Sequence, residues 1–308
     1  MKEGITLKIG IDLGGSHIAV GVVNNKNVIV EKLEKRIMSE EKKDIKNSIE
    51  TYIIENAKKL SSKYEITEMG IAVPGTVKEN EIIKSVNLGI QNYKLVDELY
   101  KDFNQEMVFN FPIRLRNDAK CAAIAESKIG TLKQYQRSLF LSLGTGIGGA
   151  VVINGKLLDT GDLPGCEFGH IIIEKDGLKC NCGKKGCFER YASMKAFKMR
   201  MREELGFTES TSGKELLDII NKNRDDDNIN RIIDEFVDYL SIGISNLVNI
   251  FEPEAVCIGG SFVYFANVFL ERLKNKIKSD KLLFNKRDEL IILPASLSND
   301  AGIIGATL

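Results

Sequence analysis

Short runs of β-branched and other apolar residues alternate along the chain with longer segments whose apolar positions recur at helical spacing. In the first half this pattern predicts strands at 7–11, 18–23, 27–33, 69–73 and 112–115, with helices over about 41–61, 95–103 and 119–129. In the second half it predicts strands at 139–143, 149–153, 171–173, 255–258 and 290–293, with helices near 232–250 and 263–277 and after residue 300. Such alternation is typical of α/β architecture.

The two halves also resemble each other directly. The segment from Leu13 to Lys26 aligns without gaps on the segment from Leu143 to Lys156, and each reads as a strand, a glycine-rich turn and a second strand. Two hairpins can look alike by chance, but the shared order of elements around them favours a duplicated architecture. We therefore expect an N-terminal α/β lobe at 1–118, onto which a C-terminal helix at 299–308 packs back, and a second α/β lobe at 119–298.

The glycine-rich turns are candidate phosphate-binding elements, because backbone without a Cβ lets N–H groups approach a phosphate closely. No GxxxxGK[ST] motif is present, and the later turn runs into a predicted strand rather than the helix of a dinucleotide fold. A single glycine turn is more often a plain hairpin, but two equivalent turns indicate a bound nucleotide, with a third glycine pair as a place for its adenosine. The candidate residues are Gly14, Gly15, Ser16, Gly144, Thr145, Gly146, Gly148, Gly149, Gly259 and Gly260.

Asp12 directly precedes the first turn, whereas the aligned position in the second half is Ser142. A carboxylate at a strand end beside a phosphate turn suits Mg²⁺, held directly or through water. The alternative is an aspartate that accepts hydrogen bonds within its own turn.

One histidine and three cysteines lie within eighteen residues of one another: His170, Cys180, Cys182 and Cys187. Together they complete a tetrahedral Zn²⁺ shell, which leaves no position for an activated water and predicts a structural site in a zinc loop at 166–189. Burial of Cys180 and Cys182 is not expected in this polar, turn-rich segment. The rival interpretation is a zinc ribbon that binds nucleic acid, which would usually bring an excess of basic residues. The other cysteines, Cys121, Cys166 and Cys257, are interpreted as packing residues.

Composition limits the function classes further. The 308 residues suggest two domains, and Lys plus Arg equals Asp plus Glu at 43 each, so the formal net charge is zero. This balance offers no electrostatic footprint for nucleic acid or an anionic membrane. The apolar runs are too short to span a bilayer, no secretory signal is apparent, and six cysteines in a chain of this length do not form a disulfide framework. The predicted compartment is the reducing cytoplasm.

The segment from Asp12 to Ser16, the triplet Asn117-Asp118-Ala119, the later glycine turn and the Glu167 to Cys187 segment resemble the ROK family of bacterial sugar kinases across essentially the whole chain. The resemblance implies two actin/hexokinase-like (ribonuclease H-like) lobes with a nucleotide and sugar cleft between them. It implies Asp118 as the catalytic base, for which the alternative role is a helix N-cap. It also implies sugar contacts from Gly75, Asn87, Asn117, Asp118, Glu167, His170 and Glu189.

The implied activity is an ATP-dependent hexose kinase of carbohydrate metabolism, with Mg²⁺ in catalysis and Zn²⁺ in structure. Glucose is the first candidate substrate, which would place the protein at the entry to glycolysis, and N-acetylmannosamine or another hexose or N-acetylhexosamine is the alternative. The family also includes sugar-responsive repressors, but those carry an N-terminal helix-turn-helix, and only six residues precede the first predicted strand here. The resemblance further implies a homodimer or homotetramer. Three positions depart from the usual pattern: Ser16, Lys120 and His17, the last expected at the surface.

Overall fold

The computed structural model describes residues 6–15, 17–105, 111–158, 166–208, 211–284 and 290–308. The chain divides into two compact units. The first unit comprises residues 1–133, 155–165 and 297–308, and the second unit comprises residues 134–154 and 166–296. In this division the first unit extends to Lys133, whereas the boundary expected from the sequence was at position 118. Residues 297–308, which include the C-terminal helix expected at 299–308, belong to the first unit.

The first unit is built around a five-stranded sheet in the order β3-β2-β1-β4-β8. β1 and β2 form an antiparallel hairpin, whereas β4 runs parallel to β1 and β8 runs parallel to β4. A separate antiparallel sheet has the order β5-β6-β7. The strands are β1 (Leu7–Leu13), β2 (His17–Asn24), β3 (Ile29–Arg36), β4 (Ile66–Val73), β5 (Thr76–Lys78), β6 (Glu81–Ser85), β7 (Ile90–Tyr93), β8 (Ile113–Asn117) and the short β11 (Lys156–Leu157).

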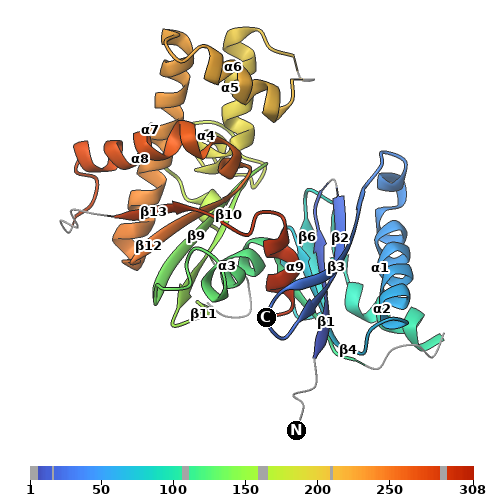
Figure 1. Cartoon of the computed structure of the whole chain (residues 1–308). Helices are drawn as coiled ribbons and strands as arrows, with labels where there is room; N and C mark the ends of the chain where they lie inside the picture. The colour runs from blue at the N-terminus through green and yellow to red at the C-terminus, as the bar shows by residue number, and fades with distance from the viewer. Residues whose placement is uncertain (1–5, 16, 106–110, 159–165, 209–210, 285–289) are drawn as a thin grey trace. The chain divides into compact units, whose positions relative to one another are not determined.

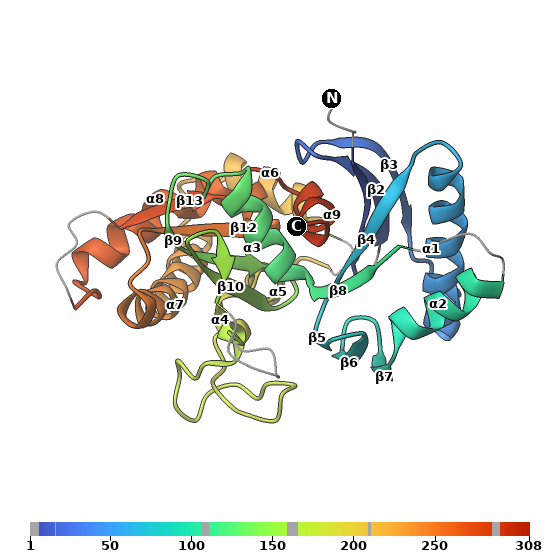
Figure 2. The same ribbon diagram turned by 90° about the horizontal axis from the view of Figure 1, so that it is seen from below.

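Helices cover both faces of this sheet, as both views show (Figures 1 and 2). On one face α1 and α2 bury a large aliphatic core against the strands, with Ile53 and Leu99 fully buried. On the other face α9 packs on β1 and β4 and against α3, using small residues and Ile303. The helices are η1 (Glu41–Asp44), α1 (Ile45–Ser61), α2 (Leu95–Gln105), α3 (Asp118–Lys128) and α9 (Asp300–Ala306).

The contact between α3 and α9 is close enough to require glycine. A Cβ on Gly305 would overlap the backbone carbonyl of Cys121, and a backbone contact cannot relax as a flexible side chain can. We expect Gly305→Ala to lower the free energy of unfolding by about 1–3 kcal/mol, the usual cost of overpacking. Urea denaturation of the variant and the parent checks this, and an unchanged midpoint would show that the helices can separate without cost.

The second unit repeats the arrangement: β9 and β10 form an antiparallel hairpin, β12 runs parallel to β9, and β13 runs parallel to β12, in a sheet of order β11-β10-β9-β12-β13. An aromatic cluster holds its helices together: Phe197 of α5 packs against Phe236 of α7 and Phe269 of α8. The elements are β9 (Arg137–Leu143), β10 (Ile147–Ile153), η2 (Phe168–His170), α4 (Glu189–Ala192), α5 (Met194–Leu205), α6 (Gly213–Lys222), α7 (Asp227–Phe251), β12 (Ala255–Gly260), η3 (Ser261–Phe265), α8 (Ala266–Ser279) and β13 (Ile291–Pro294).

The predicted alternation is confirmed, as is the repeated hairpin: the hairpin of β1 and β2 and the hairpin of β9 and β10 occupy the same place in each sheet order. The strand predicted at 171–173 is wrong. Only an isolated bridge between Ile172 and Cys187 forms there, because the segment belongs to the cysteine-rich loop rather than to a sheet. In the described part of the chain, no helix has the length and apolar character that crossing a membrane requires.

Candidate functional site

Asp118 lies at the junction where β8 ends and α3 begins. The N-cap of α3 is Asn117, whose side-chain oxygen accepts the N–H of Lys120 at 3.1 Å. The Asp118 carboxylate accepts the N–H of Ala119 at 2.8 Å, and its own backbone N–H and the Asn117 side chain also hydrogen-bond to it. The N-cap role considered for Asp118 is therefore wrong, because the residue before it fills that role. A carboxylate at the start of a helix remains available for chemistry.

The electrostatic environment of Asp118 favours its neutral form. Desolvation, with a smaller contribution from the negative charge of Asp12, raises the pKa of Asp118 to about 7 against the lowering effect of the Ala119 N–H. A carboxyl group that titrates near neutral pH can accept a proton at a catalytically useful driving force. The geometry and the titration together make Asp118 a candidate general base.

Asp12 lies near the end of β1, and the exposed fraction of its side chain is 16%. The Nε2 atom of His17 lies 3.8 Å from its Oδ2 atom, and the nearby carboxylate raises the pKa of His17. A Cβ on Gly14 would lie 2.5 Å from the same imidazole, so the ring covers the start of the turn. His17, which we expected at the surface, is half-buried beside Asp12, with 35% of its side chain exposed. Ser16 lies outside the described residues.

Four further predicted residues of the first unit meet in two pairs, Asn117 with Gly75 and Gly15 with Asn87. Asn117 donates from its side-chain amide to the carbonyl of Gly75 at 2.9 Å. Gly75 has a φ of +105°, and a Cβ there would overlap the Lys84 carbonyl, so glycine is required for the fold as well. Gly15 faces Asn87, whose backbone and Cβ lie just over 3 Å from where a Gly15 Cβ would be. The predicted nucleotide turn and the predicted sugar contacts are thus adjacent within this unit.

In the second unit the glycines of the later turn divide into two kinds. Gly144 has open space around it, and its N–H donates to the Gly146 carbonyl at 3.0 Å to close the turn. A Cβ on Gly146 would lie 2.6 Å from the Oε2 atom of Glu189. Gly149 instead lets β10 pack closely on Phe140 and Phe168. Thr145 extends from the open end of the turn and Gly148 follows on β10, so the ligand-accessible part is the segment from Gly144 to Gly146.

The third glycine pair is similarly divided. Gly259 is buried, and a Cβ there would contact the Phe140 ring at 2.8 Å. Gly260 is exposed with a φ of +70° and lies close to the backbone of Leu143. Of the two residues predicted to support an adenosine, only Gly260 presents its surface.

The four predicted metal ligands converge. One ligand atom from each of His170, Cys180, Cys182 and Cys187 lies within 4.8 Å of all the others. The Cys182 and Cys187 sulfurs are 3.5 Å apart, and the Cys180 sulfur is 3.7 Å from His170 Nδ1. Tetrahedral zinc with ordinary bond lengths would separate such atoms by roughly 3.5–3.8 Å. The donor set and its spacing fit a zinc ion, although Cys180 is buried, contrary to expectation, and only Cys182 is exposed.

Glu189 connects this cluster to the glycine turn. Its Oε1 atom lies 3.2 Å from the Cys180 sulfur and 3.7 Å from His170 Nδ1, while its Oε2 faces Gly146. Glu167 precedes η2, and its carbonyl accepts the N–H of His170 at 3.0 Å. The loop therefore holds Glu167, His170 and Glu189 in one neighbourhood of the second unit.

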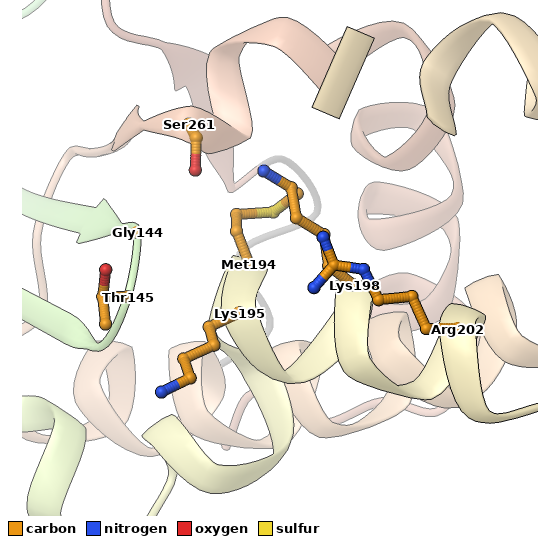
Figure 3. A pocket seen from close by; sticks show the side chains of 7 residues that line it. All are labelled: Gly144, Thr145, Met194, Lys195, Lys198, Arg202 and Ser261. Carbon is orange, nitrogen blue, oxygen red and sulfur yellow. The ribbon is translucent and has the colours of Figure 1, made fainter. Parts of the chain in front are cut away.

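A pocket of about 210 Å³ opens beside the glycine turn, and sequence reasoning did not predict most of its wall. Figure 3 shows side chains of α5 on one side and the Thr145 and Ser261 hydroxyls on the other. The α5 residues recur at positions 194, 198 and 202, four apart on one helix face, with Lys195 beside them. That spacing was a readable signal. The lining residues are Gly144, Thr145, Met194, Lys195, Lys198, Arg202 and Ser261.

Comparisons with known proteins find relatives that match nearly the whole chain. A glucokinase of Thermotoga maritima is 32% identical over 97% of this chain and 95% of its own length. A xylose repressor of Bacillus spizizenii is 28% identical over 96% of this chain and 75% of its own length. The crystal structure of a ROK family glucokinase from Streptomyces griseus, in complex with glucose and AMPPNP, is 26% identical and superposes with a TM-score of 0.81, covering 97% of both chains.

These likenesses confirm the predicted fold class, an α/β fold of two actin/hexokinase-like lobes. The family model described as ROK matches residues 8–308, which is nearly the entire sequence. This chain belongs to the ROK family.

Proposed function

We propose that this protein is an ATP-dependent hexose kinase that transfers the γ-phosphoryl group of ATP to a sugar hydroxyl, with glucose as the first candidate substrate. The observation that carries the proposal is Asp118, a helix-start carboxyl with a pKa of about 7 beside a second carboxylate, Asp12. The similarity to glucokinases over nearly the full chain supports the same activity.

In the proposed reaction, the Asp118 carboxylate accepts the proton of the sugar hydroxyl while the oxygen of that hydroxyl attacks the γ-phosphorus. The bond from that phosphorus to the bridging oxygen breaks, and ADP leaves with the electron pair. Phosphoryl transfer needs mainly positioning and charge neutralisation. We assign positioning of the sugar to Gly75, Asn87 and Asn117 of the first unit and to Glu167, His170 and Glu189 of the second unit.

The phosphates are assigned to the two turns, Gly14 to Ser16 and Gly144 to Gly149, with Gly260 and its neighbour Gly259 toward the nucleoside. Mg²⁺, which supplies charge neutralisation when bound, would be held by Asp12, because carboxylate oxygens are its preferred protein ligands. The pKa of Asp118 is raised mainly by desolvation, and the same negative charge of Asp12 adds to the rise. Zn²⁺ would be held by His170, Cys180, Cys182 and Cys187, where it would fix the loop that carries Glu167 and Glu189.

The substrate is tested by a coupled assay that follows ADP formation from ATP with a panel of sugars. The panel comprises glucose, mannose, allose, fructose, N-acetylglucosamine and N-acetylmannosamine. We expect the highest kcat/KM with glucose. A preference for an N-acetylhexosamine would keep the kinase and replace its substrate, whereas no turnover with any sugar would contradict the proposal.

The other class to distinguish is a sugar-responsive regulator, which the similarity to a xylose repressor brings into consideration. A regulator binds sugar without turnover and binds operator DNA. We expect turnover, and no retardation of DNA fragments from the upstream region of its own gene. We further expect a homodimer or homotetramer by light scattering, and free thiols typical of the cytoplasm by thiol titration of the unfolded, metal-free protein.

The pH profile should report the titration of Asp118. A general base acts in its deprotonated form, so kcat/KM should rise with pH through about 7 and level off above it. Below that value the rate should fall about tenfold per pH unit, as expected for one essential group. Initial rates at subsaturating sugar across this range check the prediction. A flat profile through neutral pH would contradict the assignment.

A further inference from the structure

Leu178 lies where two segments of the cysteine-rich loop meet, and Figure 2 shows this loop extending away from α4. The Leu178 carbonyl accepts the N–H of Gly186 at 2.9 Å, and Gly186 directly precedes Cys187. Two residues after Leu178 the chain reaches Cys180. The backbone position of Leu178 therefore influences where two of the candidate zinc ligands lie.

Tyr191 of α4 holds Leu178 from outside this segment of the loop. The Leu178 N–H donates to the Tyr191 hydroxyl oxygen at 2.6 Å. The fit is close, because a Cβ on the adjacent Gly177 would overlap the same oxygen. Glycine at position 177 thus leaves room for the hydroxyl. This hydrogen bond fastens the loop to α4 through atoms that belong to none of the candidate metal ligands.

The helix α4 is in turn fixed on α7, again by aromatic side chains. The ring of Tyr191 packs against the ring of Tyr239, with 4.5 Å between their centroids. Phe188, the N-cap of α4, is fully buried, and a Cβ on Gly243 would overlap its ring. Tyr239 and Gly243 are four residues apart, so they lie on the same face of α7. One face of a long helix therefore supports both ends of α4.

Glu189 lies in the chain between these two aromatic anchors. Its Oε1 atom is 3.2 Å from the Cys180 sulfur and 3.7 Å from His170 Nδ1. Both distances join α4 to the loop, and they would change if the loop moved against α4. A bond that holds the loop to α4 therefore also holds Glu189 beside His170.

We propose that Tyr191 is a positioning residue of the cysteine-rich loop, whose hydroxyl fixes Leu178 to α4 and so keeps Glu189 and the candidate zinc ligands in place. The inference rests on the proposed function, in which Glu189 and His170 contact the sugar. It adds a support for that site that does not depend on a metal-ligand bond. Because Tyr191 positions groups that bind the sugar, it affects sugar binding more than the transfer step.

Tyr191→Phe tests this role, because it removes the hydroxyl and keeps the ring that packs on Tyr239. We expect zinc to pass from this variant to a chromogenic chelator roughly 3–10-fold faster than from the parent, as loss of one hydrogen bond predicts. KM for glucose should rise by a similar factor, with kcat changed less than about twofold. Tyr64→Phe is the matched control, since the Tyr64 hydroxyl also donates a hydrogen bond, to Glu31 at 3.0 Å in the first unit.

Gly177→Ala tests the same contact from the side of the loop. The added Cβ would displace the Tyr191 hydroxyl from Leu178, so this variant should reproduce the effects of Tyr191→Phe. In the double variant the hydroxyl that the Cβ would overlap is missing. The two effects should therefore not add, as expected for residues in direct contact. Circular dichroism verifies that each variant is folded.

The results separate this inference from the proposed function. Parental zinc release and KM in Tyr191→Phe, or equal changes in Tyr64→Phe, would overturn the inference and leave the kinase intact. Additive effects of the changes at positions 177 and 191 would also overturn it, because they would show that the two residues act independently. If the parent phosphorylated no sugar and Tyr191→Phe still released zinc faster, the proposed function would fail and the role of Tyr191 in the loop would stand.

Discussion

Replacing Asp118 with asparagine is expected to lower kcat for sugar phosphorylation by about 10²–10⁴-fold, the usual contribution of a general base. The amide has nearly the shape of the carboxyl group but cannot accept the proton. Because Asn117 and not Asp118 caps α3, the substitution removes no capping interaction. Steady-state kinetics with saturating ATP and sugar measure the effect, and calorimetry of sugar binding measures what remains.

The stability of this variant provides an internal control. The folded-state pKa of Asp118 is raised above its unfolded value, so the carboxylate form costs stability as pH rises through about 7. Asp118→Asn should therefore be at least as stable as the parent at pH 8, and its sugar affinity should be largely retained. Asp225→Asn, an exposed change of the same chemistry, should leave kcat unchanged. An Asp118→Asn enzyme with most of its activity would remove Asp118 from the role of base.

Replacing Cys187 with serine is expected to abolish stoichiometric zinc binding and to weaken sugar binding by roughly 10–100-fold, the range seen when groups that support a site are lost. Cys187 is fully buried and its sulfur lies 3.5 Å from that of Cys182. Without the metal, the ends of the loop would be joined only by hydrogen bonds such as those from the Phe188 N–H to the Ile171 carbonyl and from the Ile173 N–H to the Gly186 carbonyl, among the described residues. Glu189, two residues away, would then lose its fixed position beside His170.

Atomic emission of the purified protein measures zinc, and calorimetry measures sugar affinity, since the chain has no tryptophan for intrinsic fluorescence. Cys166→Ser is the matched control, because Cys166 lies in the same segment but outside the ligand set. It should retain both zinc and sugar. If Cys187→Ser kept one zinc per chain, the metal would have to lie elsewhere. If it lost zinc with unaltered sugar affinity, the loop would not support the sugar site.

Local signals in the sequence were sufficient for the order of elements and for the convergence of one histidine and three cysteines. Because apolar periodicity is a property of each segment, the bounds of most strands and helices in both units were predicted to within a few residues. The sequence also predicted that each glycine-rich turn connects the two strands of a hairpin. The ligands His170 to Cys187 lie close in the chain, and their spacing alone implies convergence. The strand predicted at 171–173 does not form, because its apolar residues lie in the cysteine-rich loop. The small sheet of β5, β6 and β7 and the helices α4, α5 and α6 were not predicted.

Tertiary structure decided what depends on residues far apart or on solvent exclusion. The pKa of Asp118 follows from burial and from Asp12, more than a hundred positions earlier, which no local pattern records. Likewise, His17 became a neighbour of Asp12 through strand pairing. The cations of α5 line a pocket because an aromatic cluster orients that helix toward the turn at Gly144. The sequence by itself determined which chemical groups are present, and packing determined which of them are desolvated and which face one another.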